Sequence, residues 1–135
     1  MKLVSYLHFG GQCEAAFKFY ERVLDGKLVA LRNHADSPMA DKTPPEWQAK
    51  IMHAELQVGD QTLMGSDAPP DYFRPPQGFA VSLAVEDEFE SERIFAALAE
   101  GGKISMPLGP TFWSPRFGML TDQFGIPWLV SGGSL

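Results

Sequence analysis

The sequence predicts an α+β domain built from two βαβββ units, and three observations lead to that fold class. The chain repeats itself once, because residues 5–9 (SYLHF) return 76 residues later as residues 81–85 (VSLAV). Each copy continues into an amphipathic helical stretch and then into a Gly-Lys pair, at Gly26 and at Gly102. Each copy ends in alternating apolar and polar residues around a turn, as expected of a hairpin. Two such units in tandem predict a cleft, and a repeat of this kind decides the fold.

The first unit begins with a strand over residues 3–9, which ends at Gly10 and Gly11. Apolar residues then recur at helical spacing from Cys13 to Leu24 and predict an amphipathic helix of about three turns. Gly26 is expected to end this helix, because glycine takes the left-handed C-terminal conformation at little cost. Residues 27–32 follow as the second strand.

Residues 51–58 alternate cleanly, with Met52, Ala54 and Leu56 on one face and His53 and Glu55 on the other. The apolar face is expected to pack on the helix, which turns His53 and Glu55 toward a cavity or toward water. Residues 59–60 form a turn, and residues 61–65 return as an antiparallel strand.

The second unit is predicted to repeat this order. It has a strand at 79–85, a helix at 88–100, a short strand at 103–106 and a hairpin at 116–130. We expect one domain over residues 1–135, with module 1 at about 1–66 and module 2 at about 78–132. The long connections 34–49 and 66–77 hold seven of the eleven prolines. They are interpreted as rigid linkers, lids or interface arms.

Composition excludes several classes of function. The formal net charge is −6 without a basic run, which argues against nucleic-acid or anionic-membrane partners. The single cysteine, Cys13, cannot form an intrachain disulfide, and its place on the apolar helix face favours a buried thiol over a nucleophile. No stretch predicts a signal peptide or a membrane span, so a cytoplasmic location is expected.

Several runs resemble one family over essentially the whole chain: CEAAFKFY at 13–20, HAEL at 53–56, MPL at 106–108, TFW at 111–113 and TDQFGIPW at 121–128. They are similar to the PhnB-like branch of the vicinal oxygen chelate superfamily, which includes glyoxalase I, bleomycin-resistance proteins, fosfomycin-resistance enzymes and extradiol dioxygenases. The resemblance implies paired βαβββ modules whose mixed sheet curls around a cavity, and a homodimer. Some PhnB-like proteins are labelled demethylubiquinone methyltransferases. This sequence lacks a glycine-rich strand-to-helix turn for a methyl-donor nucleotide, which argues against that activity.

The resemblance also implies where a divalent metal would bind. The family places its first-strand ligand at a fixed distance before the helix tyrosine, which is Tyr20 here, and the repeat offset gives the corresponding position in the second module. The family's last-strand ligand follows a turn that contains Gly125 here, and aligning Gly59 with Gly125 gives the corresponding position in the first module. The four positions hold Ser5, Leu63, Val81 and Leu129. None is a good ligand, so no metal or other cofactor is expected, and a divalent metal is the disfavoured alternative.

Other residues are candidates for ligand binding. His8 is interpreted as structural, because it lies on the strand face opposite Ser5. His53 and Glu55 could bind a polar ligand or act as acid and base, although an ordinary solvated strand face is the simpler interpretation. In the second module, Thr111, Trp113, Arg116 and Trp128 are candidates for a pocket wall with polar anchors, against ordinary core or interface packing.

Three hypotheses follow. The first is a protein that binds an unidentified small organic molecule in the cavity between the modules, without the usual metal. The second is a metal-dependent lyase, isomerase or transferase with a rearranged site using His8, His53 or Glu55. The third is a dimeric scaffold whose cavity is filled by its own side chains. The first is favoured, and whether any reaction is catalysed stays open.

Overall fold

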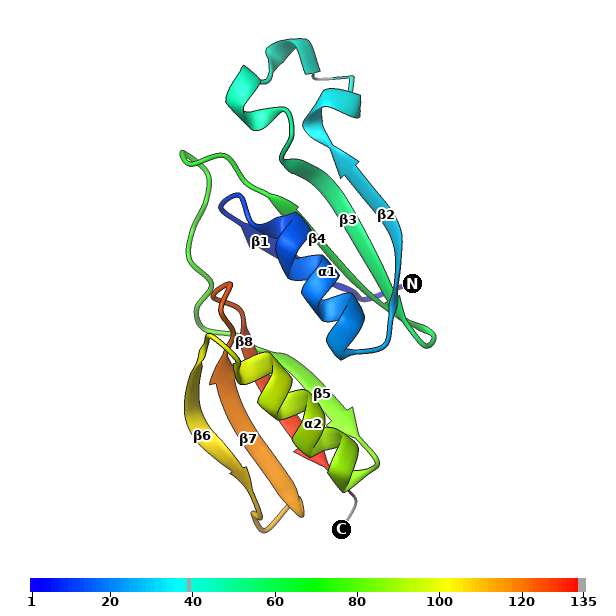
Figure 1. Ribbon diagram of the computed structural model, residues 1–135, viewed down its shortest axis with the longest axis vertical. Helices are drawn as coiled ribbons and strands as arrows, with labels where there is room; N and C mark the ends of the chain where they lie inside the picture. Colours follow the sequence, from blue (N-terminus) through cyan, green and yellow to red (C-terminus); the bar gives the residue numbers. More distant parts are fainter. Residues whose placement is uncertain (39, 134–135) are drawn as a thin grey trace. The chain divides into compact units, whose positions relative to one another are not determined.

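The computed structural model describes residues 1–38 and 40–133, and the chain divides into two compact units, Met1–Pro75 and Pro76–Leu135. Each unit holds one four-stranded sheet and one helix of three turns (Figure 1). The α+β fold class and the two βαβββ units are therefore confirmed.

Unit 1 contains β1 (Ser5–Phe9), α1 (Cys13–Val23), β2 (Lys27–Asn33), β3 (Ile51–Val58) and β4 (Gln61–Asp67). Its strand order is β1-β4-β3-β2, with β1 parallel to β4 and the other pairs antiparallel. The parallel pair joins the first strand to the last, so the hairpin of β3 and β4 lies against the strand that precedes the helix.

Unit 2 repeats this connectivity. It contains β5 (Val81–Val85), α2 (Glu88–Ala99), β6 (Lys103–Gly109), β7 (Arg116–Thr121) and β8 (Pro127–Gly132), in the order β5-β8-β7-β6. Strands β5 and β8 are parallel, as β1 and β4 are. The duplication that the sequence predicted thus extends to strand order and pairing.

In unit 1, α1 packs on one face of the sheet (Figure 1). Leu7, Phe9, Ala54 and Leu56 are at most 2% exposed on this face, where the ring of Phe9 meets that of Phe17 at 6.1 Å. Because side chains alternate along a strand, the intervening residues of β1 and β3 point to the opposite face, which no helix in the described part of unit 1 covers. We call it the open face.

The helix end differs from its prediction. Asp25, with φ 52°, takes the left-handed conformation expected of Gly26. Aspartate tolerates this conformation better than most residues. Gly26 is required for another reason, since a Cβ atom there would lie 2.8 Å from the carbonyl oxygen of Gln57.

The connection between β2 and β3 is more ordered than the sequence indicated. It contains three short 3₁₀ turns, His34–Asp36, Ala40–Lys42 and Pro45–Trp47. In the described part of the chain, no helix is long and apolar enough to cross a membrane.

Candidate ligand-binding site

Four polar and aromatic side chains gather on the open face of unit 1: Tyr6, His8, His53 and Glu55. We call them the Tyr6 cluster. The Tyr6 hydroxyl lies 3.2 Å from Nδ1 of His53, and Nε2 of His53 lies 3.8 Å from Oε1 of Glu55. The ring of Tyr6 stacks on that of His53 at 5.8 Å and meets that of His8 at 5.2 Å. A phenol, an imidazole and a carboxylate thus lie next to one another, with a hydrogen bond at the first contact and a longer separation at the second.

The sheet register creates this cluster from three strands. Met64 of β4 pairs with Tyr6 on one side and with Glu55 on the other. His53 lies two residues before Glu55 on β3, so its ring reaches Tyr6 diagonally across β4. The side chains of His53 and Glu55 remain 32% and 29% exposed, and Tyr6 is 41% exposed. A ligand on this face could therefore reach all three.

The structure confirms the predicted face of His53 and Glu55 and corrects the metal positions inferred from the repeat. Ser5 lies on the helix face of β1, and Leu63, 7% exposed, lies on the helix face of β4. Val81 of β5 pairs with the buried Trp128 of β8, so it also lies on the helix face of its sheet. Of the four positions only Leu129 is on an open face. A shift of one residue reverses the direction of every side chain in a strand, and the count back from the helix did not detect this shift.

The open-face positions of the two parallel strand pairs do not fit the superfamily's metal either. In unit 1 they are Tyr6, His8, Met64 and Ser66, and in unit 2 they are Ser82, Ala84, Leu129 and Ser131. This set contains one imidazole and no carboxylate, whereas a divalent ion needs several such donors. Among residues 1–38 and 40–133, no three His, Cys, Asp or Glu side chains lie close enough to hold a metal ion.

A buried carboxylate holds the turn next to the Tyr6 cluster. Asp67 is 3% exposed, and its Oδ1 accepts hydrogen bonds from the backbone N–H groups of Gly11 and Cys13, each at 2.9 Å. Its Oδ2 accepts one from the N–H of Ile51, also at 2.9 Å. Asp67 therefore joins the start of α1 to the start of β3.

Cys13 has no role as a nucleophile. It is fully buried, and burial, Asp67 and Glu14 together raise the pKa of its thiol. The reactive form is the thiolate, so the neutral thiol is inert at neutral pH.

In unit 2, Thr111 and Trp113 lie in the loop between β6 and β7. The hydroxyl of Thr111 accepts a hydrogen bond from the N–H of Ser114 at 3.1 Å. The indole of Trp113 is 48% exposed and packs edge-on against Phe112 at 4.6 Å and Phe117 at 5.3 Å. Trp113 thus offers an aromatic surface to solvent, while the Thr111 hydroxyl is used to close the loop.

Arg116 and Trp128 have structural partners. The guanidinium of Arg116 lies 3.0 Å from Glu92 and 3.9 Å from Glu88, both on α2. Trp128 is 1% exposed, and its Nε1 donates to Oδ2 of Asp122 at 2.8 Å. The structure therefore brings His53 and Glu55 together with Tyr6 and His8. In unit 2, Arg116 pairs with α2 and Trp128 is buried, so neither lies on the sheet face opposite the helix.

Comparison with known proteins identifies the family. A family model described as 3-demethylubiquinone-9 3-methyltransferase matches residues 1–131. Protein YjdN of Escherichia coli (strain K12) is 34% identical, over 97% of this chain and 95% of that protein. The chain belongs to the PhnB-like family. This is the family that the sequence runs indicated.

Solved structures agree with the PhnB-like assignment. Protein PA1353 from Pseudomonas aeruginosa is 47% identical, with a TM-score of 0.91 over 98% of both chains. A putative 3-demethylubiquinone-9 3-methyltransferase, PhnB protein, from Bacillus cereus is 27% identical, with a TM-score of 0.83 over 98% of this chain and 100% of that one. The fosfomycin resistance protein FosX from Mesorhizobium loti shares the fold, with a TM-score of 0.63 over 100% of this chain and 93% of that one, at 13% identity. The PhnB-like chain therefore has the glyoxalase/bleomycin-resistance fold of the vicinal oxygen chelate superfamily.

Sequence reasoning missed Tyr6 as a functional candidate. Tyr6 could have been found from the pairing of β1 with β4, which places it in the same row across the sheet as Glu55. This pairing could have been inferred from the family's topology, but not from local pattern alone.

Proposed function

We propose that this PhnB-like chain binds a small organic molecule on the open face of unit 1, at the Tyr6 cluster, without the superfamily's metal. One observation carries the proposal: the Tyr6 hydroxyl, His53 and Glu55 lie next to one another on a sheet face that no helix among the described residues of the unit covers.

The cluster offers both donors and acceptors to a ligand. The hydroxyl of Tyr6 can donate or accept, an imidazole can do both through its two nitrogens, and the carboxylate of Glu55 accepts. Each ring nitrogen of His53 can donate or accept according to the tautomer, so the imidazole can present an N–H to an electron-rich group. The rings of Tyr6 and His8 add flat apolar surface beside these polar atoms. Such a mixture suits a molecule with a ring and one or two polar substituents.

The experiment is a fluorine NMR screen of small aromatic acids, phenols and amides against the full-length protein. Matched variants are Tyr6→Phe, which removes only the hydroxyl, and His53→Gln. The control is Lys18→Gln on α1, whose half-exposed ammonium forms an ion pair with Glu14. We expect hits whose line broadening is lost in both cluster variants and kept in the control. A panel without such hits would refute the proposal.

A metal assay separates the alternative. Stoichiometric divalent metal retained by wild-type protein through dialysis, and lost in His53→Gln, would favour a metal-dependent enzyme with a rearranged site instead. The homodimer is a further proposal from family resemblance, and sedimentation equilibrium would test it.

A further inference from the structure

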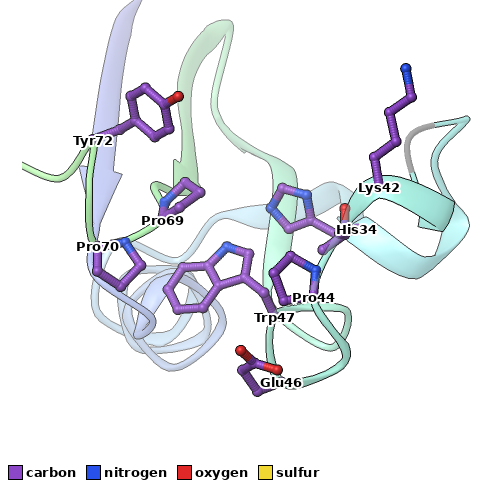
Figure 2. A pocket seen from close by; sticks show the side chains of 9 residues that line it. His34, Lys42, Pro44, Glu46, Trp47, Pro69, Pro70 and Tyr72 are labelled. Carbon is purple, nitrogen blue, oxygen red and sulfur yellow. The ribbon is translucent and has the colours of Figure 1, made fainter.

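The two proline-rich connections of unit 1 enclose a hollow away from the Tyr6 cluster. Residues from 34–47, between β2 and β3, and from 69–72, after β4, line a cavity of about 430 Å³ (Figure 2). The sequence indicated linkers, lids or interface arms here. The structure instead places two segments that lie more than twenty residues apart around one cavity, which is large enough for a small molecule.

Two nitrogen atoms at this hollow lack hydrogen-bond partners. Nε1 of Trp47 and Nε2 of His34 are both buried, and neither has a partner among residues 1–38 and 40–133. An indole nitrogen only donates, while an imidazole nitrogen donates or accepts according to its tautomer. Buried polar atoms are nearly always paired in folded proteins, so these two nitrogens need partners that the described residues do not supply, either water or a ligand with hydrogen-bond acceptors.

The remaining walls are flat and mostly apolar. The rings of Pro69, Pro70 and Tyr72 come from the second connection, on the side of the indole away from Glu46 (Figure 2). Two charged side chains line this hollow among the described residues, the ammonium of Lys42 and the carboxylate of Glu46. The aromatic rings of Trp47 and Tyr72 favour a planar partner.

Backbone hydrogen bonds hold these walls in place without a ligand. The N–H of Trp47 donates to the carbonyl of Pro44 at 2.9 Å, and that of Lys50 donates to the carbonyl of Trp47 at 3.0 Å. The ammonium of Lys50 reaches the carbonyl of Gly11 at 3.0 Å, which ties this connection to the start of α1. The N–H of Tyr72 donates to the carbonyl of Pro69 at 2.8 Å. The hollow is therefore formed in advance, which reduces the entropy lost on binding.

We propose that this hollow is a second ligand site, which binds a planar aromatic carboxylate. The carboxylate accepts hydrogen bonds from Nε1 of Trp47 and Nε2 of His34. The ring lies against Pro69, Pro70 and Tyr72. The volume is near the lower end of the range of small-molecule sites, about 300–1,000 Å³, which selects compounds of one or two rings.

Titration of the full-length, ¹⁵N-labelled protein with 2-naphthoate tests the site. The chain has three tryptophans, so three indole N–H signals report separately. We expect the Trp47 signal to shift and saturate, and the Trp128 signal to stay fixed because its N–H is held by Asp122. Cyclohexanecarboxylate, which has the charge but not the planar ring, should bind about tenfold more weakly or worse. Equal binding of the two compounds, or a fixed Trp47 signal, overturns the proposal.

Calorimetry on variants checks the contacts independently. Trp47→Phe keeps an aromatic ring and removes the donor, so affinity for 2-naphthoate should fall about tenfold or more. Trp113→Phe in unit 2 is the matched control and should leave the affinity unchanged. His53→Gln distinguishes this site from the Tyr6 cluster, because it alters that cluster and none of the residues that line the hollow. Loss of binding in His53→Gln with retention in Trp47→Phe would assign the ligand to the open face and overturn the second site.

Discussion

Asp67 offers the most direct test of the structural reasoning, because one buried carboxylate joins three segments of unit 1. The perturbation is Asp67→Asn, which keeps the shape of the side chain and replaces one oxygen by an NH₂ group. The amide oxygen can still accept from the N–H groups of Gly11 and Cys13, as Oδ1 does. The NH₂ group would then face the N–H of Ile51, a donor against a donor.

The magnitude follows from these contacts. A hydrogen bond to a charged acceptor contributes about 1.5–3 kcal/mol, and a buried N–H left without a partner costs about 1–3 kcal/mol more. These two contributions overlap, so the free energy of unfolding should fall by about 2–4 kcal/mol. If the amide turns the other way, the N–H groups of Gly11 and Cys13 lose their acceptor, and the free energy of unfolding falls further.

The assay is urea unfolding followed by circular dichroism, with amide hydrogen exchange as a local readout. We expect a lower urea concentration at the unfolding midpoint, with an unchanged dependence of the free energy of unfolding on urea concentration. We also expect faster hydrogen exchange at the backbone N–H of Ile51. The matched control is Asp87→Asn, since Asp87 caps α2 through two N–H groups and asparagine caps equally well. If Asp67→Asn stays within about 0.5 kcal/mol of wild type, the assignment of Asp67 as the link between α1 and β3 is refuted.

Three further predictions concern buried positions. Burial, Asp67 and Glu14 raise the pKa of Cys13, so the folded chain keeps its proton where the unfolded chain loses it. This stabilisation is complete below about pH 8.5 and falls by about 1.4 kcal/mol per pH unit above it. Urea titrations at about pH 8 and about pH 10 should show this fall in wild type and not in Cys13→Ala. Gly65→Ala should destabilise unit 1 by about 1–3 kcal/mol, because its Cβ would lie 2.7 Å from Cε1 of Phe17; unchanged thermal unfolding would contradict this. Trp128→Phe removes the hydrogen bond to Asp122 and should cost about 3 kcal/mol in chemical unfolding; a loss under about 1 kcal/mol would contradict the burial of that pair.

Most of the fold could be predicted, because it depends on local pattern and on repetition. The run from Cys13 to Val23 has helical periodicity, and 51–58 alternates, so both elements follow from side-chain direction. The repeat then supplied the second unit. The end of α1 could not be assigned correctly, because Asp25 and Gly26 are adjacent and both tolerate unusual backbone conformations.

The candidate site was predicted only in part. His53 and Glu55 were placed on the correct face because their spacing on one strand is enough to decide it. Their partners come from β1, which lies beyond β4 in the sheet. The error in the metal positions has the same origin. Counting residues along the chain does not fix which face a strand presents when the turn before the helix changes length.

The sequence by itself determined the class of fold and the family. These properties follow from periodicity, duplication and residue type, which are local. Only the tertiary structure decided which side chains share a surface. The pairing of β1 with β4 brings Tyr6 to His53 and Glu55, and the two proline-rich connections meet around His34 and Trp47. Both arrangements join residues far apart in the chain, and such contacts depend on sheet register and loop packing, which no local pattern encodes.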